Sequence, residues 1–372
     1  MNPFMPLFLL LGGSLASLLV DRFLEKMGAI KWRGYLAAFI LAITLFLFSW
    51  EAYLGVEIAE FRIIGPESPL TSSLRIDYFV IFFSIMFCGL GLAVCIYSFR
   101  YFGSEVGLDR YYLLLLGLIA GMVGVILAND LFTLYVFWEL MALSSYSLVA
   151  FKKLSWEAVE AGFKYLIISV SGSIAILFGI SLLYGLAGVL NFTQLESVIG
   201  STKGGMLLYV ALLMLIAGFG VKAAIVPLHT WLPDAYTAAP SPASAIIAGG
   251  STGLGVLVLC KLLFFLFPHL VTVWATFFAV FSVLNMLVGN VAGLLQDDVK
   301  RILAYSSIAH VGYIFIGVAA GTRLGLTGVL LHTFNHGILK ALAFLCIGAI
   351  EYRLNARSLN DIAGIGRRMP IT

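Results

Sequence analysis

The sequence predicts an all-α protein, a polytopic membrane helical bundle with about eleven transmembrane helices. Three observations lead to this fold class. Hydrophobic residues make up 61% of the 372 residues and charged residues only 11%, whereas roughly a quarter of the residues in soluble domains are charged. Apolar runs of about 20 residues, the length that crosses a bilayer, repeat along nearly the whole chain. The connections between them are short, so the helices should pack as one bundle.

The apolar runs follow one another with little sequence between them. In chain order they cover residues 4–20, 34–53, 78–99, 111–128, 131–151, 161–186, 205–226, 243–267, 271–295, 303–320 and 324–350. The first run has no basic region before it and no soluble domain after it, which favours a retained helix over a cleaved signal. Residues 194–203 are expected to form a polar external connection. Residues 51–77 form a longer one, and the alternation over residues 56–64 suggests a short exposed hairpin.

The positions of Lys and Arg predict the orientation, because cytoplasmic loops carry an excess of these residues. With the N-terminus outside, fourteen basic residues fall in inside loops: Arg22, Lys26, Lys31, Arg33, Arg100, Arg110, Lys152, Lys153, Lys300, Arg301, Arg353, Arg357, Arg367 and Arg368. Only four fall outside: Arg62, Arg75, Lys203 and Arg323. The remaining four lie within runs: Lys164, Lys222, Lys261 and Lys340. The N-terminus is therefore predicted outside and residue 372 inside.

The seventh run contains a lysine that is followed five residues later by a proline. Pro227 has no N–H and its ring crowds the carbonyl one turn back, so the helix should kink or break there. The freed backbone groups are tolerated in a bilayer only beside protein or water. Lys222 would cost roughly 2.5–3.5 kcal/mol to insert at the bilayer centre, and such residues usually mark ion or proton paths. A charge beside a broken helix is the arrangement that a transport site needs.

Glu139 is the carboxylate that we expect to act with Lys222. It lies in Leu-Tyr-Val-Phe-Trp-Glu-Leu-Met-Ala-Leu, with apolar residues on both sides. In the functional interpretation it binds protons and modulates Lys222, and the two form a gating pair. In the structural alternative they form an ion pair that only holds two helices together. A buried lysine can release its proton when its carboxylate partner moves or is neutralised, as a proton relay requires.

The last run carries a polar stripe of His332, His336 and Lys340 at intervals of four residues. The stripe is about 12 Å long at 1.5 Å per residue of helix. Histidine titrates near neutral pH and can pass protons on. Two histidines one turn apart can also bind zinc, but no third ligand with suitable spacing is visible, so no metal site is predicted.

Four further residues are candidates for the relay, each with a structural alternative. Glu160 and Lys164 are one turn apart near the inner surface, where they can simply pair. His310 lies in another run and is either a link in the relay or a satisfied buried histidine. His229 follows the break and is expected to cap it or line it.

Two aspartates and the four cysteines can be explained by structure alone, and the motifs that the sequence lacks exclude other functions. Asp130 and Asp234 lie at predicted helix ends, where capping explains them nearly as well as transport does. The four cysteines lie in apolar runs without CxxC or zinc-finger spacing and are expected to be buried thiols. The sequence has no glycine-rich phosphate loop, no Ser/His/Asp signature and no basic stripe. This excludes soluble-enzyme chemistry and nucleic-acid binding.

Four stretches of the sequence together resemble the antiporter-like subunit family. They are Phe-Trp-Glu-Leu-Met around Glu139, Val-Lys-Ala-Ala-Ile-Val-Pro-Leu-His-Thr-Trp-Leu-Pro-Asp-Ala-Tyr around Lys222, Asp-Asp-Val-Lys-Arg-Ile-Leu-Ala-Tyr-Ser-Ser-Ile-Ala-His-Val-Gly-Tyr around Lys300, and His-Thr-Phe-Asn-His-Gly-Ile-Leu-Lys-Ala-Leu around Lys340. The family comprises Mrp-type Na⁺/H⁺ antiporter large subunits, the proton-pumping membrane subunits of respiratory complex I, and related subunits of membrane-bound hydrogenase complexes. The match spans nearly the whole chain.

The resemblance implies two inverted five-helix repeats, each centred on a broken helix, and a relay in the membrane plane. Residues 1–110 would hold helices 1–3, residues 111–267 the first repeat with helices 4–8, and residues 268–372 a partial second repeat with helices 9–11. By this resemblance, Glu139 matches the carboxylate of the family and Lys222 matches the lysine of its broken helix. His332, His336 and Lys340 match the polar stripe of its second half.

The sequence departs from the family pattern in two places. The family often has a lysine or histidine in the run after the broken helix, where this sequence has Ser-Thr-Gly-Leu-Gly at residues 251–255. Water, Ser251 or Thr252 would then have to bridge the relay, or the relay is interrupted. The sequence also ends at residue 372, where the second broken helix would begin. The second repeat is therefore expected to be incomplete in this sequence, and the missing helix would come from another chain, come from residues outside this sequence, or not exist.

The expected function is that of a proton- or Na⁺-translocating antiporter-like subunit in a multi-subunit membrane complex of the complex I or hydrogenase type. We expect no redox cofactor and no metal in this chain, so that any redox chemistry belongs to partner subunits. The alternatives are a subunit of a stand-alone Mrp-type antiporter and a degenerate structural subunit that pumps nothing. The expected location is the inner membrane of a prokaryote, with H⁺ or Na⁺, lipid and other membrane subunits as partners.

Overall fold

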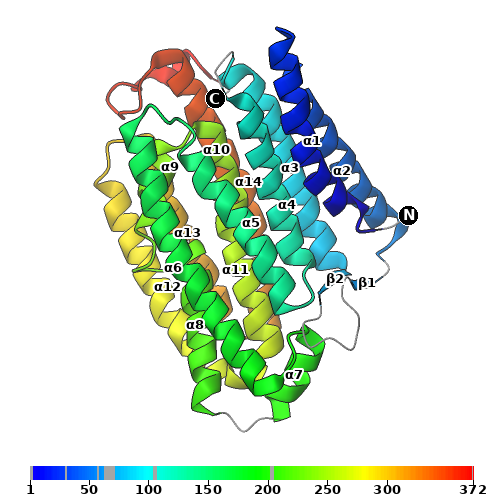
Figure 1. Ribbon diagram of the computed structural model, residues 1–372. Coiled ribbons are helices and arrows are strands. Elements are labelled where there is room, and N and C mark those ends of the chain that lie inside the picture. The colour runs from blue at the N-terminus through cyan, green and yellow to red at the C-terminus, as the bar shows by residue number, and fades with distance from the viewer. Residues whose placement is uncertain are drawn as a thin grey trace.

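The computed structural model describes residues 3–29, 32–56, 58–62, 72–103, 107–201, 205–370 and 372. The molecule is an elongated bundle whose long helices run along one common axis (Figure 1). The first half contains α1 (Met5–Lys26), α2 (Tyr35–Leu54), β1 (Ala59–Arg62), β2 (Ser73–Ile76), α3 (Tyr78–Tyr101), α4 (Leu108–Leu127), α5 (Leu131–Val149), α6 (Trp156–Ala187) and α7 (Phe192–Ser201). The second half contains α8 (Met206–Lys222), α9 (Trp231–Ala238), α10 (Ser241–Ile246), the π-helical turns η2 (Ile247–Ser251) and η3 (Leu262–Leu266) on either side of α11 (Thr252–Lys261), a 3₁₀ turn η4 (Pro268–Leu270), α12 (Val271–Leu294), α13 (Val299–Ala319), α14 (Arg323–Leu354) and a 3₁₀ turn η5 (Ile365–Arg367).

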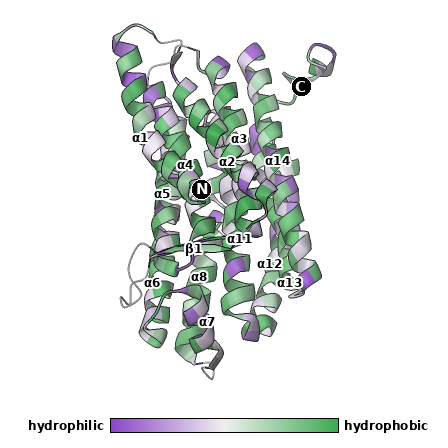
Figure 2. Cartoon of the chain, turned by 90° about the vertical axis from the view of Figure 1, so that its right-hand side faces the viewer, coloured by the Kyte–Doolittle hydropathy of each residue, from purple (hydrophilic) through white to green (hydrophobic). Residues whose placement is uncertain are grey.

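Ten helical segments of the described residues are long and apolar enough to cross a membrane. They correspond to the predicted runs, apart from the seventh. That run appears as α8, which has 17 residues, followed by a break and the short helix α9. Hydrophobic residues dominate the helices along most of their length (Figure 2). The predicted all-α membrane bundle of about eleven helices, one of them broken near Pro227, is therefore confirmed.

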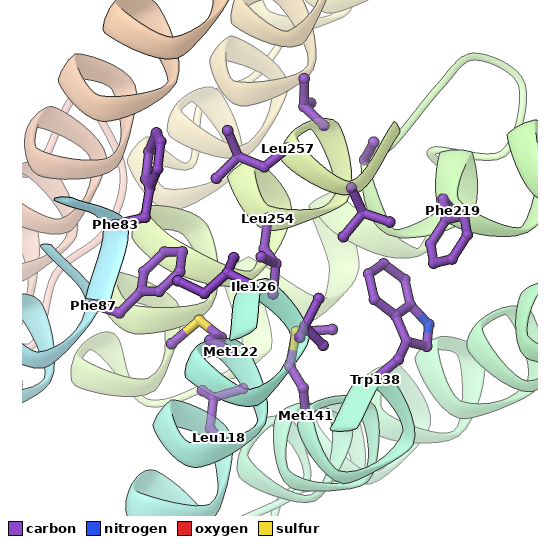
Figure 3. Packing of buried hydrophobic residues seen from close by; sticks show 14 of the residues in the cluster. Phe83, Phe87, Leu118, Met122, Ile126, Trp138, Met141, Phe219, Leu254 and Leu257 are labelled. Atoms are coloured by element: carbon purple, nitrogen blue, oxygen red, sulfur yellow. The ribbon is translucent and has the colours of Figure 1, made fainter. Parts of the chain in front are cut away.

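The centre of the bundle is formed by α4 and by the continuous segment Ser241–Leu266. In these two segments 83% and 94% of the most apolar stretch is buried, compared with 22% in the segment that contains α12. Met122 and Ile126 of α4 lie beside Leu254 of α11, with Phe87 of α3 next to them (Figure 3). The functional side chains described below are therefore held around a tightly packed apolar core.

A two-stranded hairpin lies at the ends of α3 and α4 that point away from the C-terminus (Figure 1). Strands β1 and β2 pair antiparallel, with Ala59 opposite Ile76, so the predicted hairpin is formed, but β2 is mostly buried and not exposed as expected. Residues 63–71 between the strands lie outside the described residues. The Asp130 carboxylate holds the hairpin to the bundle by accepting from Ser73 N at 2.7 Å. It also caps α5 by accepting from Thr133 N at 2.7 Å. Capping thus accounts for Asp130.

Two predicted connections differ in the structure. Residues 194–203 were expected to be a polar connection, but most of them belong to helix α7, in which Phe192, Leu195 and Ile199 are buried at helical spacing. Lys300 was counted as an inside-loop residue, but it lies in the first turn of α13 and is only 1% exposed. Lys31, which was counted inside, and Lys203, which was counted outside, lie outside the described residues.

Candidate functional site

Helix α8 ends at Lys222, five residues before Pro227. Pro227 offers no N–H to the carbonyl of Ala223, four residues before it. The last regular helical bond runs from Ala223 N to Phe219 O at 3.0 Å, and from Ala224 onward the pattern changes. Ala224 then adopts a left-handed conformation with φ of 57°, and the Val226–Pro227 peptide bond is cis. The chain resumes as α9 at Trp231. The break therefore places Lys222 at the C-terminal end of a helix, where the helix dipole favours a cation.

The backbone groups freed by the break are bound by side chains. The Asn285 side chain of α12 accepts from Val226 N at 2.9 Å and donates to Ala224 O at 2.9 Å. Trp231 donates from its indole Nε1 to Val221 O at 2.8 Å. Asn285 and Trp231 are both 0% exposed. Protein groups thus replace water at the break, as an irregular segment inside a membrane requires.

Lys222 is 2% exposed and contacts hydroxyl groups. Its Nζ donates to Ser145 Oγ at 2.7 Å and to the Tyr165 hydroxyl, and Ser145 and Tyr165 bond each other at 2.9 Å. The Tyr165 ring stacks on Trp231 with centroids 4.0 Å apart and an interplanar angle of 6°. We call Lys222, Ser145, Tyr165 and Trp231 the lysine cluster. It joins α5, α6, α8 and α9 around a single ammonium group.

Glu139 lies on α5 at the edge of the lysine cluster. Among the described residues it forms no ion pair, and the side-chain hydrogen-bond partners of Lys222 are Ser145 and Tyr165. Tyr135 and Tyr146, one turn before Glu139 and two turns after it, share its face of α5. Its Oε1 is buried without a hydrogen-bond partner among the described residues. The ion pair that was the structural alternative is therefore not formed in the structure.

The second half of the bundle brings four of the predicted relay residues together. His310 of α13 reaches His332 of α14, with Nδ1 and Nε2 3.1 Å apart, and its ring lies 5.6 Å from that of His336. His336 is 2% exposed, and neither of its nitrogens has a hydrogen-bond partner among the described residues. Lys340 is 5% exposed and donates to Ser306 Oγ at 2.8 Å and to a backbone carbonyl of α13 at 3.1 Å. We call His310, His332, His336 and Lys340 the histidine stripe.

Ser251 and Thr252 lie between the lysine cluster and the histidine stripe. Both are 0% exposed. The Thr252 hydroxyl lies 2.5 Å from the Tyr236 hydroxyl, and the Ser251 hydroxyl lies 3.8 Å from Met141 Sδ. No ionisable side chain occupies residues 247–255, so the place that the family pattern fills with a lysine or histidine is lined here by hydroxyl groups.

Glu160 and Lys164 belong to an ion-pair network at the end of the bundle that holds α9 and the C-terminus (Figure 1). Lys164 pairs with Glu160 at 2.8 Å and with Asp234 at 3.2 Å, and Asp234 also pairs with Arg301 at 3.1 Å. Asp234 lies within α9 and does not cap it, so its role differs from the expected one. His229 precedes α9, where its carbonyl accepts from the first turn of that helix, while its Nδ1 is buried and unpartnered among the described atoms.

Several residues of the site were not predicted. Tyr165 and Trp231 carry no charge and do not stand out in a sequence with 14% aromatic residues. Asn285 could have been found, because it is an amide inside an apolar run. A buried cluster at the same end of the bundle as the C-terminus was also missed: Lys300 donates to Ala239 O at 2.8 Å and pairs with Glu351 at 3.5 Å. Lys300 thereby holds the C-terminal end of α9 against α13 and α14.

Metal binding was also considered. Among the described residues, no three His, Cys, Asp or Glu side chains lie close enough together to hold a metal ion.

Comparison with known proteins places this arrangement in a family. Residues 128–372 match the family described as NADH:quinone oxidoreductase/Mrp antiporter, TM. Subunit N of NADH-quinone oxidoreductase from Desulforamulus reducens is 35% identical, over 80% of this chain and 62% of that protein. Subunit N of F(420)H(2) dehydrogenase from Methanosarcina mazei is 32% identical, over 98% of this chain and 75% of that protein. The chain thus spans between about three fifths and three quarters of the length of these relatives.

Two solved structures share the fold. A chain of the membrane-bound sulfane sulfur reductase, an archaeal respiratory membrane complex, superposes with a TM-score of 0.88 at 28% identity, covering 98% of this chain and 75% of that one. A chain of the Mrp complex from Dietzia sp. DQ12-45-1b superposes with a TM-score of 0.85 at 25% identity, covering 99% of this chain and 68% of that one. The chain therefore belongs to the NADH:quinone oxidoreductase/Mrp antiporter transmembrane family.

Proposed function

We propose that the chain is a proton- or Na⁺-translocating, antiporter-like subunit of a multi-subunit membrane complex of the respiratory complex I or membrane-bound hydrogenase type. The observation that carries the proposal is the environment of Lys222, a buried ammonium group whose direct side-chain partners are two hydroxyls. Two other lysines of the bundle are held structurally: Lys300 pairs with Glu351, and Lys261 donates to backbone carbonyls at the end of α4. Hydroxyls can both donate and accept, so they suit a lysine that changes its protonation.

Glu139 acts on Lys222 without touching it. Charges in the interior of a protein interact more strongly than in water, so the ionised Glu139 carboxylate favours the protonated lysine from a distance. When Glu139 is neutralised, or is moved by a neighbouring subunit, this support is lost and Lys222 can release a proton to its hydroxyl partners. Neutralisation or movement of the Glu139 carboxylate at the edge of the lysine cluster thereby leads to proton release from Lys222 at its centre.

The histidine stripe continues the path in the second half. His310 and His332 are within hydrogen-bonding distance, so one ring can pass a proton to the other. Lys340 lies one turn beyond His336 on α14 and is again held by a hydroxyl, that of Ser306. In the proposed relay, Glu139 and Lys222 gate the path, and the His310, His332, His336 and Lys340 side chains carry it onward.

The printed names of the relatives support membrane subunits as partners and an oxidoreductase as the complex that drives transport. This chain would then move ions while partner subunits carry out the redox reaction. The proposed orientation, with the N-terminus outside and residue 372 inside, rests on the excess of basic residues at the end of the bundle that holds α9 and the C-terminus. The division at residues 110 and 267 stays a prediction.

Two other functions have observations in their favour. The superposition on a chain of an Mrp complex supports a stand-alone cation/proton antiporter, in which an imposed Na⁺ gradient and no redox donor would drive proton movement. The absence of an ionisable side chain at residues 247–255 supports a structural subunit that pumps nothing. Driving the purified complex first with a redox donor and then with a Na⁺ gradient separates the first alternative from the proposal.

The test is ion transport by the whole complex in liposomes, with its driving reaction assayed in parallel. Lys222→Met should abolish transport in a complex that assembles normally. Lys261→Met is the matched control, because it removes another intramembrane lysine that lies outside the proposed path, and it should retain transport. Unchanged transport in Lys222→Met would mean that the ions take another route and that the chain acts as scaffold.

A further inference from the structure

A relay from the lysine cluster to the histidine stripe has to cross the centre of the bundle, where hydroxyl groups are the polar side chains. Tyr236 of α9 and Thr252, the first residue of α11, are both 0% exposed, and their hydroxyl oxygens lie 2.5 Å apart. This is a short O–H···O distance, and each group can donate to or accept from the other.

The Tyr236–Thr252 pair contacts both halves of the site. On one side the Tyr236 ring lies edge-on to Trp231 at 6.1 Å, and Trp231 stacks on Tyr165, the hydroxyl partner of Lys222. On the other side the same ring lies edge-on to Phe344 of α14 at 5.5 Å. Ser251, next to Thr252 in the chain, is fully buried, and its hydroxyl lies 3.8 Å from Met141 Sδ of α5, the helix that also carries Ser145. The Tyr236–Thr252 pair thus lies between Trp231 of the lysine cluster and the face of α14 that carries Phe344.

The facing side of α14 carries polar atoms with no partner. Thr333 Oγ1 and both ring nitrogens of His336 are buried and make no hydrogen bond to any described residue, although Thr333 and His336 are only 1% and 2% exposed. The backbones approach closely here: a Cβ on Gly253 would lie 3.0 Å from Thr333 Cγ2, and one on Gly337 would lie 2.5 Å from Gly249 O. Unpaired polar atoms in a protein interior are strongly unfavourable, and ordered water commonly satisfies them.

We propose that the Tyr236 and Thr252 hydroxyls, together with water bound by Thr333 and His336, connect the lysine cluster to the histidine stripe, and that the ion crossing this connection is a proton. In each transfer a hydroxyl oxygen accepts a proton on a lone pair and releases its own proton to the next oxygen. The hydroxyls and water therefore end neutral, Lys222 loses the proton, and a nitrogen of His336 gains it. A sodium ion has no equivalent route through paired hydroxyls. The inference rests on the proposed function and deepens it.

The experiment uses the whole complex reconstituted in liposomes, with proton uptake measured by a pH-sensitive dye in H₂O and in D₂O. Thr252→Val keeps the shape of the side chain and removes the hydroxyl, so proton transport should fall at least about tenfold. Thr252→Ser keeps the hydroxyl and should stay within about twofold of wild type. Thr44→Val is the matched control, because Thr44 is also fully buried and bonds only to the carbonyl of its own helix. Tyr236→Phe should lower transport as Thr252→Val does.

The outcomes separate this inference from the function on which it rests. If Lys222→Met abolishes transport while Thr252→Val and Tyr236→Phe leave it unchanged, the hydroxyl connection is wrong and the function stands. If Thr252→Ser falls as far as Thr252→Val, the residue acts through packing, and the inference is again wrong. A larger H₂O/D₂O rate ratio in Thr252→Val than in Thr44→Val supports slowed proton transfer. Should Thr252→Val fail to assemble, Tyr236→Phe decides the result. If Lys222→Met transports normally, the proposed function itself fails.

Discussion

Asn285→Leu should destabilise the protein strongly, because one amide side chain holds both sides of the break after α8. Asn285 is fully buried, accepts from Val226 N at 2.9 Å and donates to Ala224 O at 2.9 Å. Leucine fills a similar volume and makes neither bond. Two peptide groups inside the bundle would then lose their side-chain partner.

The expected magnitude depends on which of two costs applies. Leaving a buried polar group unpaired costs about 1–3 kcal/mol, so two groups cost about 2–6 kcal/mol. Side-chain hydrogen bonds between membrane helices average only ~0.6 kcal/mol in double-mutant cycles, or ~1 kcal/mol for two. A double-mutant cycle isolates the interaction energy between two side chains, and it leaves out the cost of a buried group that has lost its hydrogen-bond partner. Asn285→Leu leaves both peptide groups in place, so the larger range should apply.

The assay is the free energy of unfolding of the purified protein from a denaturant titration, combined with limited proteolysis of residues 223–230. Asn290→Leu is the control, because Asn290 lies on the same helix, is exposed and makes one 3.4 Å bond to Tyr313. The control should change stability by less than ~0.5 kcal/mol. If Asn285→Leu and Asn290→Leu have the same stability and the same cleavage pattern, the break is not held by Asn285 and our account of it is wrong.

Three further substitutions test other contacts. Gly218→Val should reduce the yield of folded protein, because a Cβ there would lie 2.4 Å from Ile176 Cγ1 and 2.6 Å from Gly172 O, and overpacking costs ~1–3 kcal/mol; normal yield would contradict this. Asp234→Asn should shift the unfolding free energy by less than ~1 kcal/mol, because its ion partners are partly exposed; a larger shift would show that the pairs stabilise α9. Lys300→Met should cost about 1–3 kcal/mol in the same titration, because the carbonyls at the end of α9 lose a buried donor, and protease resistance of α9 equal to wild type would count against it.

The fold could be predicted because the bilayer requires long apolar helices, and those are visible as runs in the sequence. The break could be predicted from Pro227, but its extent could not. The helix ends at Lys222 because Ala224 turns into the left-handed conformation, three residues before the proline, and that conformation has no signal in the sequence. The helix α7 was missed because ten residues with an apolar stripe are shorter than a membrane span.

The site was partly predictable because charges are rare in apolar runs, and Lys222, Glu139 and the histidine stripe stand out for that reason. Their partners could not be predicted. A direct Glu139–Lys222 contact depends on how α5 and α8 are turned relative to each other, and the structure gives Lys222 hydroxyl partners instead. Tyr165 resembles any other aromatic core residue until its hydroxyl is seen beside the lysine.

The contact between η2 and α14 has a mechanical consequence. Gly249 and Gly337 face each other with no side chain between the two backbones, as the clash of a Cβ at either position with the opposite carbonyl oxygen demonstrates. Interlocked side chains resist movement of one helix along another. At the Gly249–Gly337 contact, where η2 and α14 come closest, no side chains interlock. Packed helices rearrange by small shear displacements, and such a displacement meets least resistance here. A shift of α14 along this seam would change the spacing between His336 and the Thr252 hydroxyl without unfolding any helix.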